Sequence, residues 1–184
     1  MRRARLLMLG CAALAVAACA RDRNMAEADA PPPAGPEAVA AEMRDAQGRT
    51  RARATVEQAD DSLRVRVEAV AMSPGAYGAH LHAVGRCDRP SFTTAGAHWN
   101  PTGQMHGKDN PRGMHKGDLP NLLVGTDGRG SFEYTIPGAR LTGGGSDRLL
   151  DGDGAAMVIH AAPDDFRTDP SGNSGARTAC GVLG

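Results

Sequence analysis

The sequence His80-Leu81-His82 constrains the fold of this chain more than any other feature. In a β-strand, residues i and i+2 point to the same face, so His80 and His82 present two imidazoles side by side while Leu81 faces the other way. Two imidazoles placed in this way are half of a copper site. We therefore expect a scaffold that brings further donors to this strand, and the candidates are His98, His106, His115, Asp118 and His160.

The pattern of apolar residues predicts short strands. Residues 63–70 alternate apolar and charged side chains, which is typical of a half-buried strand. Only 3% of the chain is aromatic and it contains 24 glycines, which favours a tight-turned β fold over a helical bundle. Together these features predict an all-β fold, an eight-stranded antiparallel Greek-key β-barrel or sandwich with long metal-binding loops. Its strands are expected at 39–43, 50–57, 63–70, 78–84, 121–124, 131–136, 155–160 and 178–183.

Residues 85–120 show no periodicity and are rich in Gly, Pro and Asn. A loop of this length inside a compact domain is generally functional or disordered. This one contains a cysteine and several candidate ligands, so we expect metal binding and a disulfide to order it.

The N-terminus has the features of an export signal. Three arginines precede a short apolar run, residues 6–16, which is too short to span a bilayer as a helix. The sequence 16–19 resembles a bacterial lipobox, which predicts a signal peptide at 1–18 and a lipid on Cys19. An ordinary secretory signal cut near Ala18 or Ala20 is the alternative.

Residues 19–37 contain several prolines and almost no bulky apolar side chains, which is typical of a tether. Residues 38–184 would then form the folded domain. Ala20 after the lipidated cysteine resembles the pattern that sorts lipoproteins to the outer membrane. The expected location is therefore the periplasm, with the chain anchored through Cys19.

Charge and cysteine content agree with an exported, non-nucleic-acid-binding protein. The chain has 21 basic and 21 acidic residues, and loss of Arg2, Arg3 and Arg5 with the signal leaves an excess of acid. No basic patch indicates a nucleic-acid partner. Of the four cysteines, one lies in the signal and Cys19 accepts the lipid, so Cys87 and Cys180 remain to form a disulfide in an oxidising compartment.

The donor types restrict the metal. No thiolate is left for iron–sulfur or thiolate zinc sites, whereas imidazole suits zinc, copper, iron and nickel, and a carboxylate among histidines suits zinc. Any single histidine could be structural, but six of them with Asp118 favour metal binding. Two four-coordinate sites need about eight bonds, and these residues supply one fewer. Either one ligand binds both metals or water completes a site.

Six blocks of sequence, in order, resemble the bacterial copper/zinc superoxide dismutases. The resemblance runs from about residue 38 to the end of the chain. The blocks are 78–82 (GAHLH), 96–101 (GAHWNP), 106–107 (HG), 115–119 (HKGDL), 158–160 (VIH) and 172–182 (GNSGARTACGV).

The resemblance implies two metal sites that share His98. Copper would be bound by His80, His82, His98 and His160, and zinc by His98, His106, His115 and Asp118. Asp164 would link a copper histidine to a zinc histidine. Arg177 would attract the anion at the open face of the copper, Ser171 would line the channel, and Cys87–Cys180 matches the family's disulfide.

The implied activity is dismutation of superoxide to dioxygen and hydrogen peroxide, which would protect the cell envelope. Copper would be reduced and reoxidised in turn, with His98 carrying a proton. Arg167 and Lys116 are further candidates for steering the substrate. The alternative is a non-catalytic copper-binding envelope lipoprotein, while His106, His115 and Asp118 argue against a copper-only relative. A monomer and a homodimer are both compatible with the sequence.

Overall fold

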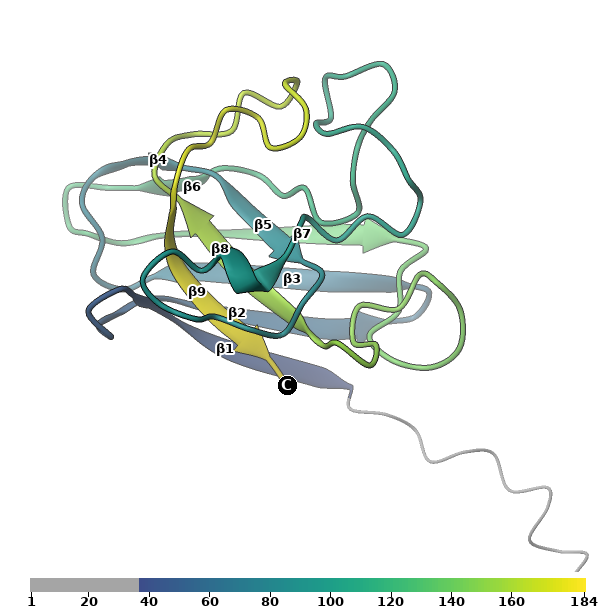
Figure 1. The fold of residues 1–184 in the computed structure, drawn as a ribbon. Helices are drawn as coiled ribbons and strands as arrows, with labels where there is room; N and C mark the ends of the chain where they lie inside the picture. Colours follow the sequence, from purple (N-terminus) through teal and green to yellow (C-terminus); the bar gives the residue numbers. More distant parts are fainter. Residues whose placement is uncertain (1–36) are drawn as a thin grey trace, which may run out of the picture. The chain divides into compact units, whose positions relative to one another are not determined.

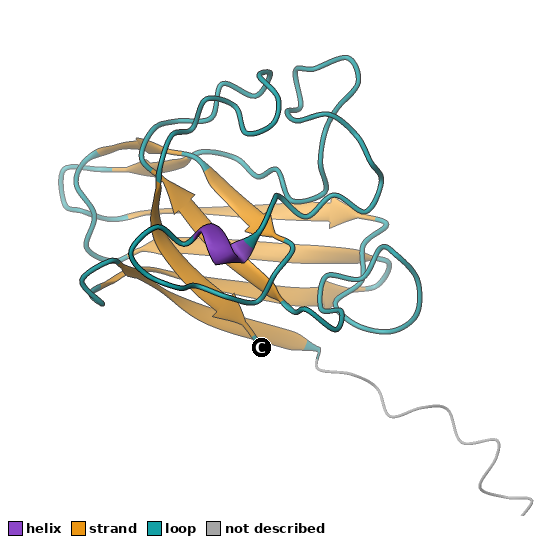
Figure 2. Ribbon diagram, in the orientation of Figure 1, coloured by secondary structure: helices purple, strands orange, loops and turns teal. Residues whose placement is uncertain are grey.

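The computed structural model describes residues 37–184. The expected signal, Cys19 and all but the last residue of the tether lie outside this part of the chain. Within it the fold is almost entirely β (Figure 2), with one short 3₁₀ helix at Thr93–Ala95 and no α-helix. None of the described residues forms a helix long and apolar enough to cross a membrane. The strands are β1 (Ala38–Asp45), β2 (Thr50–Ala59), β3 (Ser62–Ala69), β4 (Gly75–Tyr77), β5 (Ala79–His82), β6 (Leu122–Val124), β7 (Gly130–Pro137), β8 (Ala155–His160) and β9 (Arg177–Leu183).

Seven strands form one curled antiparallel sheet in the order β5-β8-β9-β1-β2-β3-β7, and β4 pairs with β6 (Figure 1). Strands β1, β2 and β3 form a meander joined by tight turns. Strands β5, β8 and β9 follow on the other side of β1, and β9 pairs with β1. This is Greek-key connectivity, as predicted.

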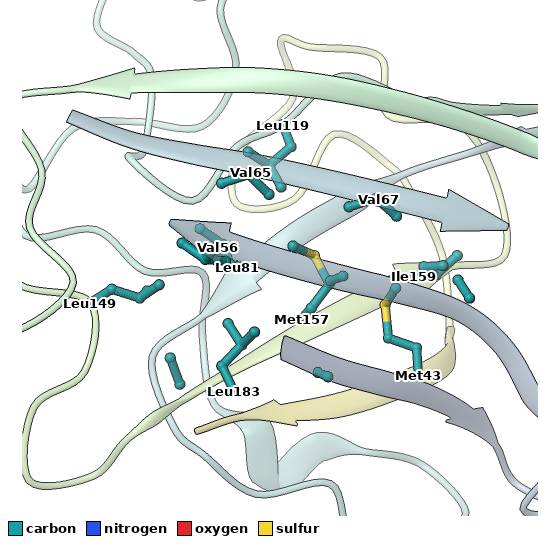
Figure 3. Close-up of a cluster of buried hydrophobic side chains, with 14 of the residues drawn as sticks. Met43, Val56, Val65, Val67, Leu81, Leu119, Leu149, Met157, Ile159 and Leu183 are labelled. Carbon is teal, nitrogen blue, oxygen red and sulfur yellow. The ribbon is translucent and has the colours of Figure 1, made fainter. Parts of the chain in front are cut away.

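The alternation of side chains decides which face of each strand is buried. In β3, Leu63, Val65 and Val67 are fully buried while the arginines between them are exposed, which confirms the prediction from the period of two. In β5, both faces are buried. Leu81 joins the hydrophobic core between the layers of the curled sheet (Figure 3). Because successive residues of a strand point to opposite faces, His80 and His82 face the other way.

All eight predicted strands are present, and the structure adds β4, which was not predicted. Its three residues follow Pro74 and are too few to show alternation; they pair with β6 through Ala76 and Leu123. The predicted strand 78–84 is shorter, because the regular pairing of β5 ends at His82.

The structure contains the predicted disulfide between Cys87 and Cys180, which are 93 residues apart. Closing a loop of this length stabilises a fold by roughly 4 to 5 kcal/mol in the chain-entropy model. The bond joins the loop after β5 to strand β9. Cys180 belongs to a second, smaller core with Phe92 and Val158, and Cys87 packs against this core.

Candidate metal centre

The long loop after β5 returns twice to this strand, and this backbone pairing places several of the candidate donors. Trp99 donates its N–H to the carbonyl of Leu81 (2.8 Å), and Leu81 donates to the carbonyl of Gly117 (2.9 Å). These contacts set His98 opposite His82, and Asp118 opposite His80. The sequence predicted ordering by metal and disulfide, whereas the structure shows that pairing with a strand also orders the loop.

Four histidines, which we call the imidazole quartet, converge beside β5. They are His80 and His82 of β5, His98 of the loop and His160 at the end of β8, and one ring nitrogen from each lies within 4.8 Å of the others. In each ring one buried nitrogen has no hydrogen-bond partner: Nδ1 of His80 and Nε2 of His82, His98 and His160. An unpaired buried polar atom is costly, so these four nitrogens fit a cation that accepts four lone pairs.

The other nitrogens of the same rings are held in place. Nδ1 of His82 donates to the carbonyl of Gly96 (2.9 Å) and Nδ1 of His160 donates to the carbonyl of Gly175 (3.1 Å). Nε2 of His80 lies 2.8 Å from a carboxylate oxygen of Asp164. Such contacts fix the tautomer and direct the free lone pair inward, as they do around bound metals.

A second set, the mixed quartet, consists of His98, His106, His115 and Asp118. Oδ1 of Asp118 lies 2.9, 3.0 and 3.2 Å from Nδ1 of His98, His106 and His115 respectively, and the Nδ1 atoms of His98 and His115 are 3.4 Å apart. Ligands about 2.0 to 2.1 Å from a tetrahedral zinc ion are about 3.3 to 3.4 Å from one another. The mixed quartet therefore has close to the size that zinc needs.

His98 belongs to both quartets through different nitrogens. Its Nδ1 faces Asp118, and its Nε2 is one of the four unpartnered atoms. One ring therefore offers a donor to each group, and the seven residues can supply eight bonds without water.

The histidine pKa values differ between the two quartets. Burial lowers the pKa of His80 to about 3, of His82 to about 2 and of His160 to about 4. Burial also lowers the pKa of His98. These rings are therefore neutral at neutral pH, which is the protonation state that binds metals.

His106 behaves in the opposite way. Burial alone would lower its pKa, but hydrogen bonds to Asp118 and Asp164 outweigh burial and raise the pKa to about 9. Burial likewise opposes ionisation of Asp118, yet its contacts with His106, His115 and His98 hold its pKa far below the usual range. Without metal the mixed quartet is thus a compensated ion pair.

Asp164 lies between the two quartets and contacts one histidine of each. One carboxylate oxygen contacts Nε2 of His80 and the other contacts Nε2 of His106 (3.0 Å), and the residue is 3% exposed. The side chain of Asn121 fixes its backbone through two hydrogen bonds, of 2.8 and 2.9 Å.

Arg177, at the start of β9, is half-buried and points toward the loop. Its guanidinium donates to the carbonyls of Phe92 (2.7 Å) and Gly96 (2.6 Å). Gly96 also accepts from His82, so one carbonyl connects the arginine to the imidazole quartet. Arg177 also lines a cavity of about 450 Å³, together with Arg51, Tyr77 and other residues.

The other candidate residues differ in their contacts and in their exposure to solvent. The ammonium of Lys116 is bound by the carbonyls of Pro137 and Gly138, so it ties the loop to the end of β7. Arg167 is exposed. Ser171 is partly buried, and its carbonyl accepts from Ser174 (2.7 Å).

Sequence reasoning missed the residues that support the centre. Phe92 holds Arg177 through its backbone, and Asn121 holds Asp164 through its side chain. Neither contact leaves a periodic or compositional signal. Phe92 adopts a left-handed backbone conformation (φ 56°) while its ring is buried. Gly96 and Gly175, whose carbonyls accept from His82 and His160, did lie within recognised blocks.

The fold is a curled Greek-key sheet of the β-barrel class, and it carries two groups of buried donors, sharing His98, that could each hold a metal ion. A model of the copper/zinc superoxide dismutase family matches residues 50–183. This chain belongs to that family.

Relatives of known name agree with this assignment. The superoxide dismutase-like protein YojM of Bacillus subtilis is 45% identical over 128 residues, which are 69% of this chain and 65% of that protein. The Cu-Zn superoxide dismutase of Caulobacter vibrioides is 42% identical over 131 residues, 70% of this chain and 75% of that protein.

Solved structures show the same fold. A superoxide dismutase-like protein from Bacillus subtilis superposes with a TM-score of 0.74 and 38% identity, covering 82% of this chain and 99% of that one. A double variant of that protein, in which a tyrosine and a proline are replaced by histidines, also gives a TM-score of 0.74, with 40% identity over 78% of this chain and 95% of that one.

Proposed function

We propose that this chain dismutates superoxide, converting two superoxide anions and two protons into dioxygen and hydrogen peroxide. The observation that carries the proposal is the imidazole quartet, in which four buried nitrogens without partners lie beside an arginine held by two carbonyls. Membership of the copper/zinc superoxide dismutase family supports it.

The imidazole quartet would hold copper and the mixed quartet would hold zinc. Four neutral imidazole nitrogens suit copper, and three histidines with one carboxylate at tetrahedral spacing suit zinc. Copper, when bound, supplies the one-electron redox chemistry that dismutation needs. Zinc has no redox chemistry, so the mixed quartet would fix the loop and the orientation of His98.

The residues of the chain have separate tasks in this reaction. Arg177 attracts the anion, and its two carbonyl contacts hold the charge near the imidazole quartet. Because the mature chain carries a net negative charge, superoxide can be attracted only by a positive charge close to the site. Salt should weaken this attraction. His98 would carry a proton on Nε2, because its Nδ1 stays bound in the mixed quartet.

The location remains part of the proposal. The lipobox sequence and the tether support an envelope lipoprotein anchored by Cys19, whose domain would remove superoxide in the periplasm. Globomycin, which blocks lipoprotein signal processing, should make the unprocessed chain accumulate in the native host, and Cys19→Ser should leave the chain unprocessed in the same way. Unaltered processing in both cases would favour the ordinary secretory signal.

The alternative function is copper binding without turnover. A specific test compares superoxide decay by stopped flow for protein loaded with zinc alone and with zinc and copper. We expect rapid decay in the second sample only, and its loss with cyanide. If the protein binds one copper ion per chain and does not accelerate superoxide decay, the proposed activity is wrong and the chain is a copper-binding protein without turnover.

A further inference from the structure

The carboxylate of Asp164 fills a space that one glycine leaves open. Asp164 accepts from the Phe166 N–H (2.6 Å) as well as contacting His80 and His106. Gly172 packs directly against it: a Cβ on this glycine would lie 1.8 Å from Oδ1 of Asp164 and 2.7 Å from Nε2 of His106. Heavy atoms in proteins do not approach this closely without bonding.

The neighbouring groups cannot yield to a side chain at this position. Gly172 is held on both sides by backbone hydrogen bonds, from its own N–H to Thr168 (2.6 Å) and from the N–H of Asp165 to its carbonyl (2.9 Å). His106 is fixed at its other nitrogen by Asp118, and Asn121 fixes the backbone of Asp164. Room for a methyl group therefore requires that the carboxylate leave one of its two histidines.

We propose that Gly172 is a positioning residue for the metal centre, because only its missing side chain lets Asp164 contact both His80 and His106. The inference rests on the proposed assignment of the mixed quartet to zinc. Gly172 acts through Asp164, which orients His106 as a ligand. Partners of metal-bound histidines typically contribute about 10- to 100-fold in metal affinity.

Another glycine offers a matched control. Gly103 also has a left-handed backbone (φ +63°, against +62° for Gly172), so alanine strains both positions similarly. A Cβ on Gly103 would have no heavy atom within 4 Å beyond its chain neighbours. The difference between the two alanine variants isolates the effect on Asp164 from the effect of backbone strain.

The test uses full-length protein, stripped of metal and titrated with zinc chloride alone against a competing chelator. We expect Gly172→Ala to weaken zinc binding about 10-fold or more, and Gly103→Ala to change it less than about 3-fold. Similar urea midpoints for the two metal-free variants would exclude general unfolding as the cause. Equal zinc affinities in the two variants would overturn the proposal.

A double-variant cycle supplies the readout that a merely structural role would not move. In an Asp164→Ala background, Gly172→Ala should lower zinc affinity no more than Gly103→Ala does, because the carboxylate that it displaces is gone. Additive losses would show that Gly172 acts by another route.

Zinc binding requires no superoxide turnover, so these results stand whether or not the chain is an enzyme. A wild-type protein that binds zinc and does not dismutate superoxide contradicts only the proposed function. A wild-type protein that fails to bind zinc would overturn the assignment of the mixed quartet, and the role of Gly172 with it.

Discussion

The two quartets of the metal centre hold their buried donors in place in different ways. The imidazole quartet takes three of its four rings from strands, whose pairing holds them in place, and it leaves four buried nitrogens unsatisfied. The mixed quartet comes from a loop and closes on Asp118, so its charges are compensated before any ion arrives. The sheet can hold an uncompensated site open, whereas the loop requires an internal ion pair.

A substitution of His98 should have the largest effect, because His98 is the one residue that belongs to both quartets. We expect His98→Ala to lower the affinity for copper and zinc together, each by about 100-fold or more, since each loses a direct ligand whose removal exceeds the effect of an outer partner. Metal content after dialysis against a weak chelator measures both.

His115→Ala is the matched variant, because His115 contributes to the mixed quartet only. It should lose zinc first and keep copper. Full zinc retention in His115→Ala would show that the second site is wrongly assigned, and selective loss of one metal in His98→Ala would show that the ring is not shared.

Asp118 tests whether the mixed quartet is compensated without metal. Asp118→Asn should destabilise the metal-free protein by about 3 kcal/mol or more, because breaking a buried ion pair leaves charge without a partner. His82→Leu in the imidazole quartet should change stability by less than about 1 kcal/mol or increase it, because it removes a buried nitrogen with no partner. The carbonyl of Gly96, which loses its hydrogen bond from Nδ1 of His82, keeps the one from Arg177. Urea unfolding of both metal-free variants gives the comparison, and equal losses would contradict it.

The pH dependence of the metal-free protein should differ in sign between the quartets. His80, His82 and His160 have folded pKa values of about 3, 2 and 4. Between these values and the unfolded pKa near 6.5, the unfolded chain binds more protons. Stability should therefore fall on acidification below about pH 6.5, by up to about 1.4 kcal/mol per pH unit for each histidine.

His106, with a folded pKa of about 9, contributes in the other direction. Its contribution is complete below about pH 6.5 and is lost as the pH rises through about 9. Urea unfolding at pH 5.0, 6.5 and 9.5 measures both arms, and His106→Gln should remove the alkaline arm alone. Stability that increases on acidification from 6.5 to 5.0 would refute the description of the imidazole quartet.

Arg177 gives the smallest expected effect and concerns the open side of the imidazole quartet. Arg177→Ala should lower the dismutation rate about 10-fold at low salt and flatten its salt dependence, because a local positive charge is lost. Metal content should not change, since the guanidinium contacts only carbonyls. Arg66→Ala, which removes an exposed arginine paired with Glu68 on β3, is the control. Unchanged kinetics in Arg177→Ala would remove the residue from the mechanism.

The sequence predicted the parts of this molecule that are periodic or carry unusual side chains. The alternation in residues 63–70 predicted β3 and its buried face, and the spacing of His80 and His82 predicted the pair of imidazoles on one face of β5. Strand β4 was missed because three residues carry no period. The support of the centre was missed for a different reason: the carbonyl of Phe92 and the side chain of Asn121 act through tertiary contacts that neither residue type announces.

One sample tests the central claim most directly: purified protein loaded with copper and zinc, in which metal content and the rate of superoxide decay are measured together. The two-quartet account predicts about one ion of each metal per chain, as two four-coordinate sites require, and a rapid decay that cyanide abolishes. Two bound metals without turnover, or turnover without copper, would contradict it.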